Sequence, residues 1–123
     1  MKLTQHIETE GNVIRAYADG EARINESVYR ESLIVTPDRL ITGWPADEGA
    51  PLAAEHLAPL LELGVDIVVI GTGRRLRFPA PEVLALLGSH GIGAEVMDTA
   101  AACRTFAVLA SEGRRVAAAL VLG

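Results

Sequence analysis

Two uninterrupted apolar runs constrain the fold of this chain more than any other feature of its sequence. Residues 66–71 read DIVVIG, and residues 116–122 read VAAALVL. A strand that is buried on one face alternates apolar and polar residues, whereas a strand covered on both faces is apolar throughout. The two runs therefore predict strands in the interior of a sheet that helices cover on both sides.

Helical spacing marks the segments that surround these runs. Apolar residues recur at three- and four-residue intervals over 57–64, 81–90 and 102–113, and each segment ends at or beside a glycine. A short strand is expected over 94–97. The resulting order of strand, helix, strand, helix and strand favours right-handed connections, which place helices on the faces of a partly parallel sheet.

The first third of the chain reads differently, as short strands at close spacing. Strands are expected over 12–18, around 22–24, over 32–36 and over 39–43, with Asn25-Glu26-Ser27 breaking the pattern. Asp19-Gly20 and Pro37-Asp38 are turn signals. This spacing favours antiparallel hairpins. The sequence thus predicts a layered α/β fold with a β-rich N-terminal part, and its 123 residues are expected to form a single domain over 1–123.

Charge and composition exclude several classes of function. The formal net charge is −5, and an acidic chain is poorly suited to a phosphate backbone, so no nucleic-acid partner is expected. His6, His56 and His90 are scattered without the spacing of metal ligands, and neither a metal nor a cofactor is expected. The sequence has neither GxGxxG nor GxxxxGK[ST], the glycine patterns of dinucleotide and nucleotide phosphate sites.

Cysteine usage and hydropathy indicate the compartment. Cys103 is the only cysteine, so no disulfide forms within the chain, which is typical of a reducing environment. The N-terminal residues lack the apolar core of a signal peptide, and no apolar run reaches the ~18 residues of a transmembrane helix. We expect a cytoplasmic protein with no transmembrane segment, at most peripheral to something else.

The best candidate for a ligand site is the loop Gly71–Arg77. Gly71-Thr72-Gly73 follows an apolar strand directly, and its free N–H groups could bind an anion beside Arg74, Arg75 and Arg77. The alternative is a tight turn with solvated arginines. Asp98-Thr99 precedes a helix, where it is either an N-terminal cap or a ligand contact. If the strands are parallel, both segments lie at the same end of adjacent strands.

Other residues are candidates for partner binding or for the core. Trp44 anchors its loop in the core or, if exposed, marks an interface. Arg114 and Arg115 make helix-end contacts and surface ion pairs or form a partner-binding patch. Cys103 lies on a mostly apolar helical face with no histidine nearby in the sequence, which favours a small buried side chain over a nucleophile.

Five segments together carry a resemblance to a known family: 32–44, Ile70–Gly73, Val96–Thr99, Ala102–Phe106 and Ser111–Leu120. In this order they resemble a family of small, mostly uncharacterised bacterial and archaeal proteins. That family also includes a mitochondrial assembly factor for respiratory complex I and a vertebrate protein linked to adipogenesis. The resemblance implies a three-layer α/β fold with a central mixed sheet flanked by helices, and no established enzymatic reaction.

One residue departs from the family pattern, and two functions remain open. The family often carries Asn where this chain has Ala107, which puts in doubt any site transferred through that position. The first hypothesis is a non-catalytic binding or assembly module with a protein partner. The alternative is a small-molecule or anion-binding enzyme that uses the Gly71–Arg77 loop and Asp98.

Overall fold

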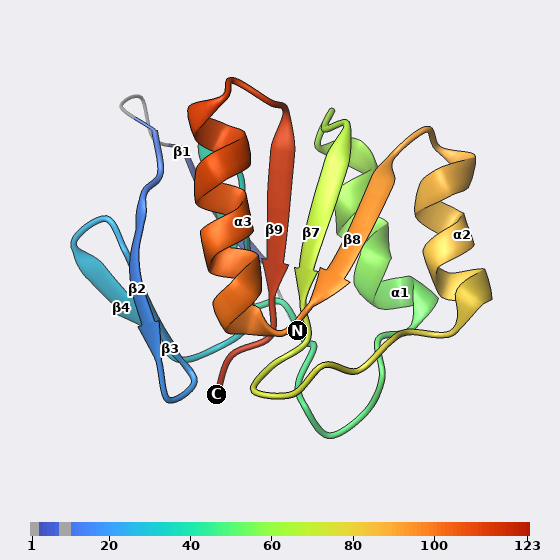
Figure 1. Cartoon of the computed structure of the whole chain (residues 1–123), viewed down its shortest axis with the longest axis horizontal. Helices are drawn as coiled ribbons and strands as arrows, with labels where there is room; N and C mark the ends of the chain where they lie inside the picture. The colour runs from blue at the N-terminus through green and yellow to red at the C-terminus, as the bar shows by residue number, and fades with distance from the viewer. Residues whose placement is uncertain (1–2, 8–10) are drawn as a thin grey trace.

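A six-stranded sheet divides the molecule into layers in the computed structural model, which describes residues 3–7 and 11–123 (Figure 1). β7 pairs in parallel with β8 and β9, whereas β9 pairs with β5, β5 with β6, and β6 with β1 in antiparallel fashion. The strands in spatial order are β1 (Thr4–Ile7), β6 (Arg39–Thr42), β5 (Leu33–Val35), β9 (Val116–Leu120), β7 (Ile67–Gly71) and β8 (Gly93–Met97). The sheet is therefore mixed, as expected.

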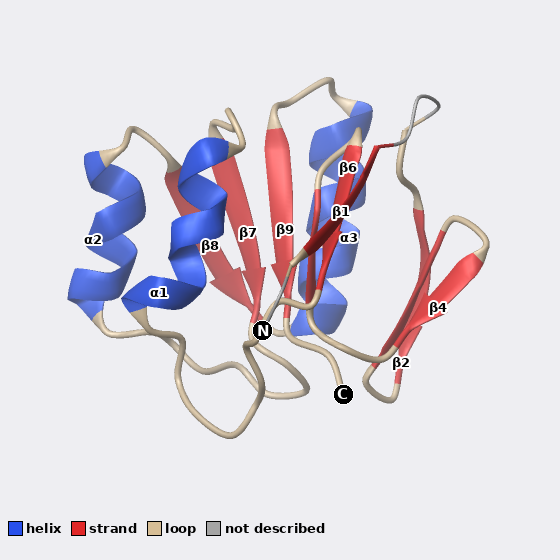
Figure 2. Ribbon diagram, turned by 180° about the vertical axis from the view of Figure 1, so that it is seen from behind, coloured by secondary structure: helices blue, strands red, loops and turns tan. Residues whose placement is uncertain are grey.

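Helices cover both faces of this sheet. α1 (Ala54–Leu57), the 3-10 helix η1 (Ala58–Glu62) and α2 (Pro81–Ser89) lie on one face, and α3 (Thr99–Ser111) lies on the other (Figure 2). The strand order explains this division. β8 and β9 flank β7 on opposite sides, so two right-handed connections place their helices on opposite faces. The predicted three-layer α/β fold is confirmed.

A second, smaller sheet lies beside α3 and is antiparallel throughout. It consists of β2 (Ile14–Ala18), β3 (Glu21–Ile24) and β4 (Ser27–Tyr29). The prediction of a break at residues 25–27 is wrong in part, because Asn25 takes a left-handed φ of 55° in a two-residue turn and the chain pairs again from Ser27. Neither β4 nor β1 was predicted.

β9 occupies the middle of the main core, and all five of its residues are fully buried. Ala117 and Ala119 face the side of α1, η1 and α2, whereas Ala118 and Leu120 face α3. Small side chains on this strand let helices approach both faces closely. The interpretation of residues 116–122 as an interior strand is confirmed, with the regular part of the strand ending at Leu120.

We expect Ala118→Asp to lower the free energy of unfolding by at least about 3 kcal/mol or to prevent folding, because it buries an unpaired charge. Ala94→Asp is the matched control, since Ala94 is exposed on the edge strand β8. Urea unfolding of both variants measures the difference. An Ala118→Asp protein as stable as the control would contradict the burial of this strand on both faces.

Candidate functional site

The ends of β7 and β8 bring the two predicted site segments together. Gly71 pairs with Met97 in the parallel ladder, and the Thr72 N–H donates to the Met97 carbonyl at 2.9 Å. Gly71–Gly73 and Asp98-Thr99 therefore lie at the same edge of adjacent strands, as the sequence indicates. The connection from β7 to β8 runs one way across the sheet, and the connection from β8 to β9 runs back the other way. In open α/β folds, a ligand usually binds at the strand ends where this reversal occurs.

Thr99 fills much of the space between these strand ends. Its buried hydroxyl accepts from the Gly73 N–H at 2.8 Å and donates to the Val121 carbonyl at 2.9 Å. The Thr99 N–H donates in turn to the Gly73 carbonyl at 2.9 Å. A Cβ on Gly71 would lie 2.9 Å from the Thr99 Cα, so glycine is needed for this close approach. The crevice is thus closed by the protein's own atoms.

Asp98 caps α3. Its side chain accepts from the Ala101 N–H at 2.8 Å, which satisfies one of the free donors in the first turn of the helix. Asp98 and Thr99 therefore differ in burial. Asp98 lies at the surface end of the helix and borders a cavity, whereas Thr99 is fully buried.

The N–H groups of the turn are not free, in contrast to the expectation from the sequence. Those of Thr72 and Gly73 are bonded as described above, and the Arg74 N–H donates to Oε2 of Glu48 at 2.8 Å. The Arg74 guanidinium also lies beside this carboxylate, with Nη1 3.3 Å from Oε1. A carboxylate of the chain itself thus occupies the place proposed for an anion.

A cavity of about 180 Å³ opens next to this turn. Gly73, Arg74 and Asp98 line it together with three residues that the sequence analysis missed: Tyr17, Asp19 and Ala100. Burial raises the pKa of the Tyr17 phenol, an effect that nearby Arg74 opposes and Glu48 reinforces. The cavity thus presents a cation and carboxylates side by side. Its use as a ligand site stays a prediction.

Nothing in the sequence could connect Tyr17 or Glu48 to this turn. Tyr17 belongs to the small sheet, and Glu48 lies in the loop before α1, 26 residues from Arg74. Neither residue stands in a motif or at a spacing that indicates a site. Only the packing of β2 beside α3 and the course of the loop before α1 place them here.

Trp44, one of the candidate partner-binding residues, belongs to the core. Its side chain is only 2% exposed, and its indole N–H donates to the His56 carbonyl at 2.8 Å. Of the two interpretations of Trp44, anchoring of the loop is therefore the one that fits its surroundings.

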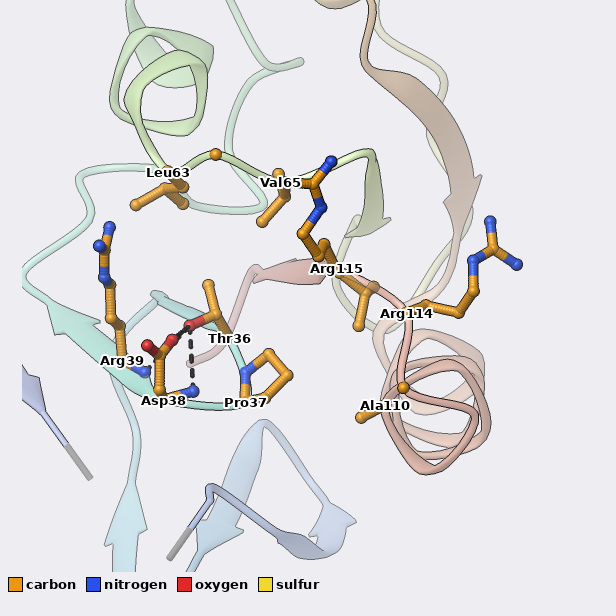
Figure 3. A pocket seen from close by; sticks show the side chains of 12 residues that line it. Thr36, Pro37, Asp38, Arg39, Leu63, Val65, Ala110, Arg114 and Arg115 are labelled. Carbon is orange, nitrogen blue, oxygen red and sulfur yellow. Dashed lines mark hydrogen bonds between the residues drawn. The ribbon is translucent and has the colours of Figure 1, made fainter. Parts of the chain in front are cut away.

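Arg114 and Arg115 line a cleft of about 350 Å³ at the opposite end of β7 and β9 from the Gly71–Gly73 turn (Figure 3). Arg115 forms a bidentate pair with Asp66, at 3.0 Å from Nε to Oδ2 and 2.9 Å from Nη2 to Oδ1. Arg114 forms no ion pair within the described residues and points away from the cleft. Arg114 and Arg115 are thus far from the candidate ligand-binding residues in the fold.

Cys103 lines a groove of about 220 Å³ between β2 and α3, which Ala107 also lines. Burial raises the pKa of the Cys103 thiol to about 12, and nearby Arg104 opposes this only in part. The thiol is therefore protonated at neutral pH and is a poor nucleophile.

The described part of the chain offers neither a metal site nor a membrane-spanning helix. No group of three or more His, Cys, Asp or Glu side chains among these residues is placed to bind a metal ion. No helix in residues 3–7 and 11–123 is both long and apolar enough to cross a membrane.

Comparisons with known proteins identify relatives of this fold and sequence. The family described as protein of unknown function (DUF498/DUF598) matches residues 14–121. A crystal structure of a Bordetella parapertussis protein superimposes with a TM-score of 0.86 at 34% identity, covering 94% of this chain and 98% of the other.

Several of the named relatives are assembly factors of animals. A Danio rerio protein named NADH dehydrogenase [ubiquinone] 1 alpha subcomplex assembly factor 3 is 34% identical over 123 residues, which cover 98% of this chain and 70% of that protein. The Bos taurus protein of the same name is 47% identical over 62 residues, half of this chain. That match spans only 34% of the bovine protein.

We expect Thr99→Val to lower the free energy of unfolding by about 2–4 kcal/mol, since each buried polar group left without a partner costs about 1–3 kcal/mol. The change removes the partner of the Gly73 N–H and of the Val121 carbonyl. Thr105→Val, on the same helix, removes only a 3.3 Å contact to the Met97 sulfur and serves as the control. Equal losses in denaturant unfolding would contradict the role of Thr99.

The raised pKa of Cys103 predicts a loss of stability at alkaline pH. Above about pH 9 the thiol ionises in the unfolded chain but not in the folded one, so the free energy of unfolding falls as pH rises toward 12. The slope is at most ~1.4 kcal/mol per pH unit for one group. Unfolding of wild type and Cys103→Ala between pH 8 and 11 measures it. The raised pKa of Tyr17 is caused first by burial in both proteins, and Cys103 reinforces it only in wild type, which adds to the same difference. Identical slopes would therefore contradict the burial of the thiol.

Proposed function

Because the chain belongs to the family of unknown function DUF498/DUF598, and because its match to a named assembly factor spans nearly its whole length, we propose that it binds a protein partner as a non-catalytic, assembly-factor-like module. The match to the Danio rerio protein is the observation that carries this proposal. A protein that assists assembly needs a surface for its client rather than a closed reaction site.

The loop after β7 is the surface that best suits a partner. Leu76 is 53% exposed and Phe78 is 64% exposed, and Arg75 and Arg77 alternate with them in the sequence. Aromatic residues and arginine are enriched at protein interfaces, where a few of them supply most of the binding energy.

Thr72 fixes the shape of this loop. Its hydroxyl donates to the Arg75 carbonyl at 2.7 Å and accepts from the Arg77 N–H at 3.0 Å, so it closes the turn from inside. The Arg77 guanidinium also donates to the Glu48 carbonyl at 3.0 Å. A loop fixed in this way loses little conformational entropy when a partner binds.

The cleft beside Arg114 and Arg115 is the weaker candidate for partner binding. Arg115 is already paired with Asp66, and Arg114 points away from the cleft (Figure 3). A partner in this cleft would contact aliphatic side chains around Leu63 and Val65 together with the charged residues Asp38 and Arg39.

The test is affinity purification of the tagged protein from its native cell, with identification of the proteins that co-elute. We expect Phe78→Ser to weaken binding by about 2 kcal/mol, or roughly thirty-fold, as for a residue near the centre of an interface. Val108→Ser is the matched control, because Val108 is similarly exposed on α3. A partner recovered equally with both variants would place the interface elsewhere, and no specific partner would contradict the proposal.

A further inference from the structure

The turn after β7 already binds a carboxylate, and that carboxylate belongs to Glu48. Its Oε2 accepts from the Arg74 backbone N–H at 2.8 Å, and its Oε1 lies 3.3 Å from Nη1 of the same residue. We propose that this turn is a carboxylate-binding site that Glu48 fills in cis and that an acidic side chain of the bound partner takes over. The proposal rests on the proposed partner-binding function and names the chemistry of the partner.

The shape of the turn is fitted to a carboxylate. Gly73 has a φ of 105°, a backbone conformation that residues other than glycine rarely adopt. A Cβ at this position would also overlap the Glu48 side chain. Glycine therefore lets the acid approach the backbone closely. The backbone N–H and the guanidinium of Arg74 then meet the same group, and such charge-assisted hydrogen bonds are the stronger kind.

A second exposed ion pair of the protein shows what distinguishes this site. The Asp66 carboxylate contacts only the guanidinium of Arg115, although with better bidentate geometry. The Glu48 carboxylate, in contrast, accepts a backbone N–H as well as a side chain. A backbone donor is fixed in place by the fold, so the turn remains a binding site after Glu48 leaves.

The Glu48 carboxylate is placed so that it can leave the turn after β7. Its side chain is 33% exposed and that of Arg74 is 54% exposed. The loop that carries Glu48 runs between two buried residues, Ala46 and Leu52, which keep its ends in the core. Exposed ion pairs contribute little to stability, so a competing carboxylate can displace this one without unfolding the protein.

The surroundings indicate which kind of acid replaces it. Leu76 and Phe78 lie exposed in the same loop as Arg74, only two and four residues further along the chain. A free small acid would leave both apolar side chains in water. A partner segment with an acidic residue beside apolar ones would cover them and pair with Arg74 at the same time.

The test compares acetate binding to wild type and to Glu48→Ala by amide NMR shifts, with acetamide and sodium chloride as controls for charge and ionic strength. We expect saturable shifts at Gly73 and Arg74 in Glu48→Ala, with an affinity about tenfold above wild type, which corresponds to an effective concentration of the tethered carboxylate about nine times the dissociation constant of acetate. Asp66→Ala is the matched control and should give no saturable amide shift at Arg115.

One further variant and a pair of peptides complete the experiment. Glu48→Gln keeps the acceptor oxygen without the charge, so it retains the loop if Glu48→Ala does not fold, and its affinity for acetate should again exceed that of wild type. A capped Leu-Glu-Phe peptide should bind Glu48→Ala more tightly than acetate does, and the Leu-Gln-Phe peptide should not.

Three results would overturn the proposal. Equal acetate affinity in wild type and in both Glu48 variants would exclude competition in cis, and an absence of saturable shifts at Gly73 and Arg74 would exclude the site. A Leu-Glu-Phe peptide no tighter than acetate would exclude a partner segment as the source of the carboxylate. Partner recovery with Phe78→Ser reports on the proposed function separately, because it does not depend on acetate binding.

Discussion

The buried hydroxyl of Thr99 joins three segments of the chain at one point. It accepts from the turn after β7 through Gly73 and donates to the chain leaving β9 at Val121, while its own residue begins α3. The position of α3 on the sheet, and with it the place of the small sheet beside that helix, depends on this junction. Gly71 and Ala102 are small enough to let the helix come this close.

The same junction decides where function can lie. In many α/β folds the crevice at the reversal of strand order is open to a ligand. Here Thr99 and Gly73 are hydrogen-bonded to each other across this crevice, through the Thr99 N–H and the Thr99 hydroxyl. The outer part of the loop after β7 remains exposed. Arg74 lies there beside Glu48, and Leu76 and Phe78 are in solvent. A closed crevice beneath a rigid, exposed loop suits recognition of another protein surface.

Most of the fold could be predicted from local patterns. The apolar runs at 66–71 and 116–122 identify the interior strands, because only residues shielded on both faces can dispense with polar neighbours. Asn25 shows the limit of such reasoning. A polar triplet breaks a strand pattern but also forms the tight turn of a hairpin, and the choice depends on whether β4 finds β3 as a partner.

The sequence by itself determined the layers, the parallel strands and the meeting of Gly71–Gly73 with Asp98-Thr99, since periodicity and the handedness of connections are local properties of the chain. Only the tertiary structure decided what occupies that meeting point. Glu48 and Tyr17 reach it from distant segments, and the hydrogen bonds of Thr99 close it from within. Which donors are free depends on long-range contacts, and neither spacing nor composition encodes those contacts.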